Sequence, residues 1–431
     1  MRRKIVLVGA GSVVFTKGLV MDILERPLEK WHIALVDINE ETLAVIEKIC
    51  RKMIKQRHAD VTLSASVDRR DVLPGADYVI STIGVGGRRA WEQDVFIPRK
   101  YGIFQPVGDT VGPGGISRAM RMIPSLLDIA KDIERLCPTA MFITYSNPMT
   151  MNCMAIRQAT NVKVMGLCHG VKNGIKRVAR FMDVPYQKLS YTACGLNHMV
   201  FMYHLRYEGQ DFFPKFIDKL NKATLEIGPL TADFVRKHNT HVVSVDRHFS
   251  EFVPSTMSEG TYYGKTLGVD AFSFEGTINY GDREFETYVN YAKSDEDLPT
   301  DFFARDPGEH EELMEIIEAI TEDKPGIFYA NLPNQGAVAG LPSNVVIERP
   351  ALFSGSGISP LQMTDFPVEL LPYMAKYAAV YEVAVQAALT GDVRLFRYAV
   401  EECSPPLTSE NSMKMADELL AAHKQDLPQF S

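Results

Sequence analysis

The chain has 431 residues, of which 46% are hydrophobic and 23% charged, a balance typical of a globular protein with a buried core. Its net charge of −8 and pI of about 5.8 argue against a nucleic-acid or anionic-membrane partner. No apolar run reaches the ~18 residues that a membrane-spanning helix needs. The six cysteines contain no CxxC pair, which favours a reducing compartment, so we expect a cytoplasmic protein.

The N-terminal half alternates short apolar runs with helical patterns, in the order expected of a doubly wound parallel sheet. Such runs are typical of strands buried on both faces. We expect strands at 5–8, 33–36, 78–83, 141–145 and 162–167, with helices at 13–24 and 41–57. Glycines interrupt the first apolar run, which predicts a strand and a turn rather than a signal peptide.

The pattern changes after residue 165, where a mixed α+β region is expected. This change predicts two domains, 1–165 and 166–431. The second is expected to contain strands at 189–193 and 201–207, helices at 309–321 and 373–389, and an exposed acidic loop at 290–310. The long apolar helix is also suited to packing between subunits.

Glycines at the end of the first predicted strand form half of a dinucleotide-binding motif, since the third glycine of GxGxxG is absent. Gly9 permits a tight turn, Gly11 lets the backbone approach a pyrophosphate, and Ser12 leads into a helix. Asp37 ends the second strand and is placed to bind ribose hydroxyls, which favours NAD over NADP. The first domain is therefore predicted to be a Rossmann-like NAD-binding domain.

A cysteine and a histidine follow later strand-like runs. Cys168 ends the run 162–167, and His198 closes the sequence Gly-Leu-Asn-His. A thiolate and a neutral imidazole suit a divalent transition metal, and oxygen ligands from substrate or water shift the preference toward Mn²⁺. Taken singly, Cys168 also fits a buried apolar cysteine, and His198 fits a core histidine. Their positions next to predicted strands favour a metal site in the second domain.

Glycine-rich and polar motifs recur in a fixed order along most of the chain. They are Gly9-Ala10-Gly11-Ser12, Gly87-Arg88-Arg89-Ala90 through Asp94, Ile97-Pro98, Lys100-Tyr101-Gly102, Gly108-Asp109-Thr110, Gly112-Pro113-Gly114-Gly115, Ser146-Asn147-Pro148-Met149, Cys168-His169-Gly170, Gly195-Leu196-Asn197-His198, Asp246-Arg247-His248, Glu251-Phe252 and Asn331-x-Pro333-Asn334. In this order the motifs resemble those of glycoside hydrolase family 4, the NAD- and Mn²⁺-dependent glycosidases.

Most glycosidases cleave the sugar with two carboxylates, and the NAD-dependent enzymes of this family are an exception. The resemblance therefore implies a different route of hydrolysis. Oxidation at C3 of the sugar acidifies the proton at C2, and a base removes that proton while the metal stabilises the enediolate. The C1 substituent is then eliminated, water adds, and the ketone is reduced again. NAD is recycled, so it acts as a catalytic cofactor.

The resemblance also implies roles for individual residues. Cys168 and His198 are expected to bind the metal, and Asn147 to contact both substrate hydroxyls and the nicotinamide. His169 occupies the position where some family members carry an aspartate that assists the leaving group, so it is a candidate proton donor.

The base is predicted to be Asp246, with His248 as a further metal ligand and Tyr262 or Tyr263 as alternative bases. The segment Asp246-Arg247-His248 equally fits a solvated charged loop.

The Cys-His-Gly form of the metal motif resembles the α-glucuronidase subgroup, with α-galacturonidase and α-galactosidase as alternatives. A uronic acid needs a positive partner for its carboxylate, ideally an arginine that binds both oxygens. Arg89 and Arg283 are the predicted substrate-binding arginines, and Arg88 and Lys172 are further candidates, although each also fits a surface charge.

Two other classes of protein share the Rossmann-like pattern. A hydroxy-acid dehydrogenase needs no metal pair and accumulates NADH, and an NAD sensor needs no catalytic residues. The pair of Cys168 and His198 and the polar motifs that follow predicted strands disfavour both. The family resemblance implies a homodimer or homotetramer that binds a small glycoside and neither nucleic acid nor membrane.

Overall fold

The computed structural model describes residues 2–26, 30–222, 227–304 and 312–430. Its strands are β1 (Arg3–Val8), β2 (Trp31–Val36), β3 (Val61–Ser66), β4 (Tyr78–Ser81), β5 (Met141–Thr144), β6 (Val164–Gly166), β7 (Leu189–Leu196), β8 (Met199–Tyr207), β9 (Gln210–Asp211), β10 (His241–Val242), β11 (Thr261–Tyr262), β12 (Lys265–Thr266), β13 (Gly326–Pro333), β14 (Val346–Ser354) and β15 (Gly357–Pro360).

The α-helices are α1 (Val13–Leu24), α2 (Glu40–Gln56), α3 (Gly87–Lys100), α4 (Gly112–Leu136), α5 (Met149–Ala159), α6 (Gly170–Met182), α7 (Phe213–Lys222), α8 (Pro229–His238), α9 (Asp246–Phe249), α10 (Phe274–Lys293), α11 (Leu313–Thr321), α12 (Leu371–Thr390), α13 (Val393–Cys403) and α14 (Ser409–Ala422). Short 3₁₀ helices are η1 (Arg69–Asp71), η2 (Tyr186–Lys188), η3 (Ser250–Phe252), η4 (Pro254–Gly260), η5 (Thr300–Phe303), η6 (Val368–Leu370), η7 (Lys424–Asp426) and η8 (Pro428–Phe430).

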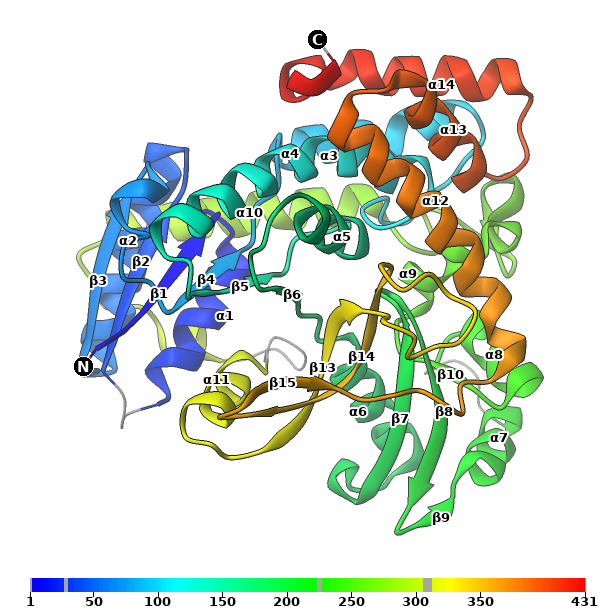
Figure 1. The fold of residues 1–431 in the computed structure, drawn as a ribbon, viewed down its shortest axis with the longest axis horizontal. Coiled ribbons are helices and arrows are strands. Elements are labelled where there is room, and N and C mark those ends of the chain that lie inside the picture. The colour runs from blue at the N-terminus through cyan, green and yellow to red at the C-terminus, as the bar shows by residue number, and fades with distance from the viewer. Residues whose placement is uncertain (1, 27–29, 223–226, 305–311, 431) are drawn as a thin grey trace.

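One large mixed sheet runs through the molecule (Figure 1). Its first part has the parallel order β3-β2-β1-β4-β5-β6, and its second part continues as β13-β14-β7-β8-β10 with antiparallel pairings. This confirms the predicted fold class, a Rossmann-like parallel sheet followed by a mixed α+β region. In such sheets ligands bind at the carboxyl ends of the strands, where the order reverses, here between β1 and β4.

Alternate residues of β1 pack into separate cores on the two faces of the sheet, as the period of a strand requires. Val6 and Val8 join the core formed with α4, α5 and α12, and Ile5 and Leu7 join the core formed with α1, α2 and α11. Figure 1 shows α4, α12, α13 and α14 gathered on one side of the molecule. Because both faces are covered, the loops at the strand ends remain to hold ligands.

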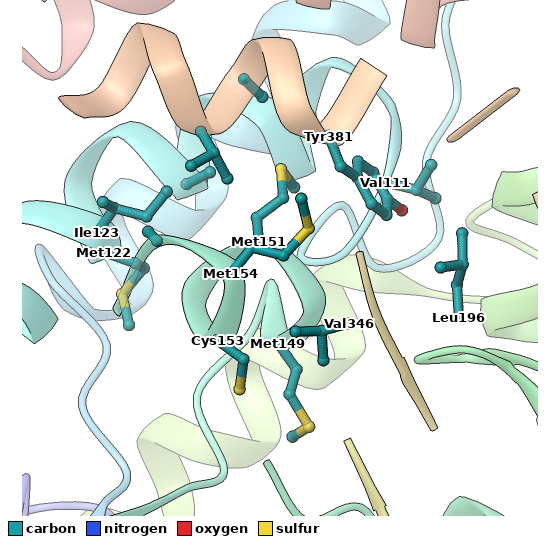
Figure 2. Packing of buried hydrophobic residues seen from close by; sticks show 14 of the residues in the cluster. Val111, Met122, Ile123, Met149, Met151, Cys153, Met154, Leu196, Val346 and Tyr381 are labelled. Atoms are coloured by element: carbon teal, nitrogen blue, oxygen red, sulfur yellow. The ribbon is translucent and has the colours of Figure 1, made fainter. Parts of the chain in front are cut away.

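Helix α5 supplies much of the buried packing next to the carboxyl end of β5. Its Met149, Met151, Cys153 and Met154 are all buried, and in Figure 2 Met151 and Met154 lie on the side that faces Tyr381 of α12. Unbranched methionine side chains fill irregular gaps between elements, which suits a helix packed against both the sheet and other helices. This packing holds the segment 146–148 that precedes the helix.

Several details differ from the sequence-based expectations. Strands β3, β13 and β14 of the large sheet were not predicted, and residues 290–293 of the expected acidic loop belong to α10. The domain boundary near residue 165 remains a prediction, because β6 joins the parallel strands to β13 within the same sheet. Residues 305–310 of the expected loop and 309–311 of the expected helix lie outside the described residues. Among the described residues no helix has the length and apolar character that crossing a bilayer requires.

Candidate active site

The predicted nucleotide turn lies at the carboxyl ends of β1 and β2. Gly9 has a φ of 88°, and a Cβ there would lie 2.7 Å from Ile83 N, so only glycine fits this turn. Gly11 N donates to Asp37 Oδ2 at 2.8 Å, and Ser12 directly precedes α1. Four predicted cofactor-binding residues, Gly9, Gly11, Ser12 and Asp37, therefore lie together in a glycine cradle at a helix N-terminus.

Asn147 follows β5 and joins this edge of the sheet to the metal-ligand candidates. Its Nδ2 donates to Asp109 Oδ2 at 2.9 Å, and its peptide bond to Pro148 is cis. Its Oδ1 is buried and makes no hydrogen bond within the described residues. A buried amide oxygen without a donor is costly, so Oδ1 is available to accept a hydrogen bond from a ligand or a water molecule.

Asp109, His198 and His248 form a group that can hold a metal ion. One ligand atom of each residue lies within 4.8 Å of the corresponding atoms of the other two. The imidazole rings of His198 and His248 are 4.4 Å apart between centroids. His198 and His248 were predicted as ligands, whereas Asp109 was not, although its Gly-Asp-Thr motif had been noted.

The β7–β8 hairpin and a threonine fix the orientation of His198. The residue lies in the two-residue turn at a φ of 67°, a backbone conformation that histidine tolerates better than most residues do. Thr110 Oγ1 donates to Asp109 Oδ1 at 2.6 Å and lies 2.9 Å from His198 Nδ1. Since the hydroxyl proton is committed to Asp109, the threonine oxygen accepts from Nδ1–H, which leaves His198 Nε2 as the free ligand atom.

The protonation states of this group suit a cation. Burial lowers the pKa of His198 to about 3 and also lowers the pKa of His248, so both rings are neutral near pH 7. Burial opposes ionisation of Asp109, but the electrostatic influence of His198 and His248, the charge of Arg118 and the Thr110 hydrogen bond hold its pKa low. One carboxylate and two neutral imidazoles are thus available without the loss of a proton.

A buried glutamate supports the loop that carries Asp109. Glu251 Oε1 accepts from Val107 N at 2.5 Å and from Gly108 N at 2.8 Å. Burial raises the pKa of Glu251 to about 8 despite these hydrogen bonds. Glu251 belongs to a motif noted in the sequence, and the structure now shows that it holds the loop before Asp109.

Cys168 and His169 lie at the start of α6 and border this group. Cys168 Sγ accepts from Gly170 N at 3.4 Å and is outside the three-residue group of Asp109, His198 and His248. His169 is exposed at the N-cap of α6, and its charge acts on both His198 and His248. The structure therefore brings the predicted Cys-His loop next to the metal-ligand candidates without placing the cysteine sulfur among them.

Asp246, the predicted base, lies at the N-terminus of α8, where other residues of the chain occupy its carboxylate. Its carboxylate accepts from Leu230 N at 3.0 Å, Thr231 N at 3.0 Å, Thr231 Oγ1 at 2.5 Å and the Tyr262 hydroxyl. Asp246 thus caps the N-terminus of α8, where backbone N–H groups lack helical partners. Its lone pairs are occupied, so it is poorly placed to remove a proton from a sugar.

The two reserve tyrosines are also committed to other residues. The Tyr262 hydroxyl donates to Asp246, and Tyr263 Oη donates to Asp233 Oδ2 at 2.8 Å. Desolvation, followed by the aspartate that each hydroxyl contacts, raises the pKa of both tyrosines above the usual value. A tyrosine acts as a base only when it is ionised, so neither environment favours that role.

The predicted anion-binding side chains are mostly neutralised. Arg88 and Arg89 both bind Asp282 of α10, Arg89 also binds Glu92, and Lys172 pairs with Glu312 at 3.2 Å. Arg283 is exposed on α10. Sequence reasoning missed a different cation, Arg118 of α4, whose Nε donates to the backbone oxygen of Asn147 at 3.1 Å.

Comparisons with known proteins agree with this architecture. A family model described as "Family 4 glycosyl hydrolase" matches residues 4–184, and a model of the "Family 4 glycosyl hydrolase C-terminal domain" matches residues 193–401. The α-galactosidase of Rhizobium meliloti (strain 1021) is 32% identical over 458 residues, covering 99% of this chain and 90% of the relative. The α-galacturonidase of Thermoanaerobacterium saccharolyticum is 28% identical over 456 residues, covering 98% and 96% of the two chains.

Solved structures show the same fold at lower identity. A 6-phospho-α-glucosidase from gut microorganisms in complex with NAD and Mn²⁺ aligns with a TM-score of 0.86 at 16% identity, over 100% of both chains. Malate dehydrogenase from Plasmodium falciparum aligns with a TM-score of 0.51 at 14% identity, over 91% of this chain and 99% of the enzyme. The predicted dehydrogenase-like architecture is thereby confirmed. Because two family models together match most of the chain, and a relative above 30% identity spans it, the chain belongs to family 4 of the glycosyl hydrolases.

Proposed function

We propose that the protein hydrolyses α-linked uronides, with α-glucuronides favoured, by oxidation, elimination and re-reduction of the sugar. The main support for this proposal is the group of Asp109, His198 and His248, which lies next to Asn147 at the carboxyl edge of a Rossmann-like sheet. The Cys168-His169-Gly170 motif, through its resemblance to the α-glucuronidase subgroup, supports the choice of sugar. Relatives named α-galacturonidase and α-galactosidase make those two substrates the alternatives.

The residues present fit NAD and a divalent cation. A side chain at Gly11 would lie 2.7 Å from Asp37 Oδ2, so the cradle beside α1 requires glycine. One carboxylate and two imidazoles suit a divalent transition metal. A 6-phospho-α-glucosidase of similar fold was solved with NAD and Mn²⁺, which supports the same pair here. When bound, the nucleotide supplies reversible hydride acceptance and the cation supplies Lewis-acid polarisation of sugar oxygens.

The chain's own residues bind and orient these partners. Asp109 Oδ2 accepts from Asn147 Nδ2, so the residue proposed to contact the sugar is fixed relative to a metal ligand. The unsatisfied Oδ1 of Asn147 is proposed to accept a hydrogen bond from a sugar hydroxyl. Cys168 is proposed as an additional ligand, which requires its sulfur to turn from Gly170 N toward the three-residue group. His169 is proposed to assist departure of the aglycone, because it borders the same group and is exposed.

A panel of p-nitrophenyl α-glycosides tests the proposal. Glucuronide, galacturonide, galactoside and glucoside are assayed with NAD⁺, Mn²⁺ and a thiol reductant, and each cofactor is then omitted in turn. The proposal expects the glucuronide to be hydrolysed fastest, with both cofactors required and no net NADH. Faster turnover of the galactoside would replace the substrate assignment, and NADH accumulation with a hydroxy acid would replace the reaction class.

The route is tested with a substrate that carries deuterium at C2. Elimination requires that this label exchange with solvent or slow the reaction. Full retention of deuterium in the product, together with an unchanged rate, would reject the elimination route while leaving hydrolysis itself intact.

A further inference from the structure

Arg118 is a cation at the edge of the site that no carboxylate of the described residues neutralises at contact distance. Within the described ranges, the one hydrogen bond of its side chain runs from Nε to the backbone oxygen of Asn147, and no carboxylate oxygen lies within 4.0 Å of its nitrogens. The side chain is half-buried on α4, so water screens its charge only in part. An arginine in such a place has unused N–H donors.

Arg121, the next arginine on the same face of α4, forms a buried ion pair with an acidic side chain. Arg121 donates from Nη1 and Nη2 to the two oxygens of Asp94, at 2.9 and 2.7 Å, and both side chains are fully buried. The other candidate cations at this end of the sheet, Arg88, Arg89 and Lys172, are likewise paired with acidic residues. Arg118 therefore differs from its neighbours, because no ion pair within the described residues accounts for the position of its charge.

The surroundings of Arg118 leave room for a ligand. Its Nη2 would lie 3.5 Å from a Cβ at Gly84, so the absence of a side chain there keeps the approach to the guanidinium open. The Trp91 ring lies 5.8 Å from its Cζ, and Trp91 Nε1 donates to Val107 O at 2.7 Å, which fixes the ring. Asp109 and Asn147 place the guanidinium beside the proposed metal and sugar positions.

We propose that Arg118 receives the anionic group on C6 of the sugar, a carboxylate or a phosphate, and so selects acidic glycosides over neutral ones. The inference deepens the proposed function and rests on it. A guanidinium matches the planar geometry of a carboxylate and can bind two of its oxygens or those of a phosphate. A neutral sugar leaves the half-buried cation without an anionic partner, and such mismatches give strong discrimination.

Steady-state kinetics of Arg118→Lys and Arg118→Gln test the inference. At saturating NAD⁺ and Mn²⁺, we expect the KM for α-glucuronide, α-galacturonide or a 6-phospho-α-glucoside to rise about 10- to 100-fold in Arg118→Gln, the range for loss of charged hydrogen bonds. The substrate whose KM rises shows whether the anion bound by Arg118 is a carboxylate or a phosphate. The KM for a neutral α-galactoside should rise far less than the KM for the acidic glycoside, and Arg118→Lys should fall between the wild type and Arg118→Gln. Arg157→Gln, an exposed arginine on α5, is the matched control.

A binding measurement separates this inference from the proposed function. Calorimetry with free glucuronate, inorganic phosphate and galactose should show binding of one of the two anions to the wild type and loss of that binding in Arg118→Gln. If the wild type hydrolyses no glycoside but still binds an anion through Arg118, the proposed function fails while the anion-binding role of Arg118 is retained. Equal losses for acidic and neutral glycosides in a folded Arg118→Gln, or a loss confined to NAD affinity, would overturn the inference.

Discussion

His198 Nδ1 lies 2.9 Å from Thr110 Oγ1, and this contact determines which ring nitrogen is free at the metal-ligand group. The same hydroxyl donates to Asp109 Oδ1 at 2.6 Å, so one threonine orients two of the three candidate ligands. Outer partners of this kind set the tautomer and direction of a metal-binding histidine. Loss of the Thr110 hydroxyl should therefore change the affinity of this group for a metal ion by a measurable amount.

Replacing Thr110 by valine should weaken Mn²⁺ binding about 10- to 100-fold, the usual effect of losing such a partner. Valine keeps the shape but removes both the acceptor for Nδ1–H and the donor to Asp109. Calorimetric titration of the metal-free protein with Mn²⁺ measures the effect. Thr110→Ser retains the hydroxyl and should bind within a fewfold of the wild type. Wild-type affinity in the valine variant would show that the contact does not orient His198.

Cys168→Ser should reduce Mn²⁺ affinity and hydrolysis together, because a serine hydroxyl is a poor substitute for a thiolate ligand. Cys403→Ala, which changes a buried cysteine of α13, is the control and should leave Mn²⁺ affinity unchanged. Titration with Mn²⁺ before and after reduction adds a second readout, since an oxidised thiol cannot ligate. Unchanged affinity in Cys168→Ser would leave the cation to Asp109, His198 and His248 alone.

Asp246→Asn should lower stability rather than abolish chemistry. An asparagine amide turns a donor toward the N–H groups of Leu230 and Thr231, so we expect a loss of about 1–3 kcal/mol in the free energy of unfolding. Urea denaturation measures the stability loss, and kcat below the melting transition measures catalysis. A catalytic base would behave in the opposite way, with native stability and a kcat lowered by several orders of magnitude.

His241 should make the protein sensitive to acid. It is 1% exposed, neither ring nitrogen has a hydrogen-bond partner among the described residues, and burial lowers its pKa to about 3. The unfolded chain has a pKa near 6.5 and binds a proton first, so stability falls as pH drops from about 6.5 toward 3, by up to about 1.4 kcal/mol per pH unit.

His241→Phe should remove this contribution, because phenylalanine does not titrate and can pack against Phe216, whose ring lies 5.7 Å away. Urea denaturation at pH 7 and pH 5 should show a smaller acid loss in this variant than in the wild type. His58→Asn, at an exposed position, should keep the wild-type pH slope. Parallel slopes for His241→Phe and the wild type would exclude His241 as the cause.

Arg121→Met should destabilise the protein by about 3–5 kcal/mol, because it leaves the charge of Asp94 buried without its main partner. Burial acts to raise the pKa of Asp94, but Arg121 and the hydrogen bond from His423 hold it low. The double variant Asp94→Leu/Arg121→Met should recover much of the loss. Thermal unfolding of the single and double variants measures both effects, and equal stabilities would show that the unpaired charge of Asp94 does not cause the loss.

The strands that the sequence predicted in the N-terminal half are those buried on both faces. The run at 5–8 and the other apolar runs are found in the structure, because continuous apolar stretches leave little choice of environment. Strand β3, Val61–Ser66, was missed because this edge strand mixes serine, threonine and alanine with two larger apolar residues and stays half-buried. Its pairing with β2 depends on a neighbour that periodicity does not reveal.

The sequence predicted the site unevenly, for a similar reason. Motifs at strand ends indicated Asn147 and His198, and the family resemblance indicated His248, but the grouping of Asp109 with them depends on a histidine 89 positions later. Asp246 was predicted as the base because the family resemblance pointed to the segment Asp246-Arg247-His248, yet its backbone partners lie 15 and 16 positions earlier on α8. Spacing along the chain identifies a segment, and only packing decides which side chain of that segment faces the ligand.

The metal-ligand group takes Asp109 from the segment matched by the first family model, and His198 and His248 from the segment matched by the second. Neither segment alone contains the group. Metal binding at this group therefore requires that the two halves of the chain be packed against each other. A polypeptide nicked between residues 184 and 193 would bind Mn²⁺ at this group only while its two fragments stay associated, so metal release would follow their separation.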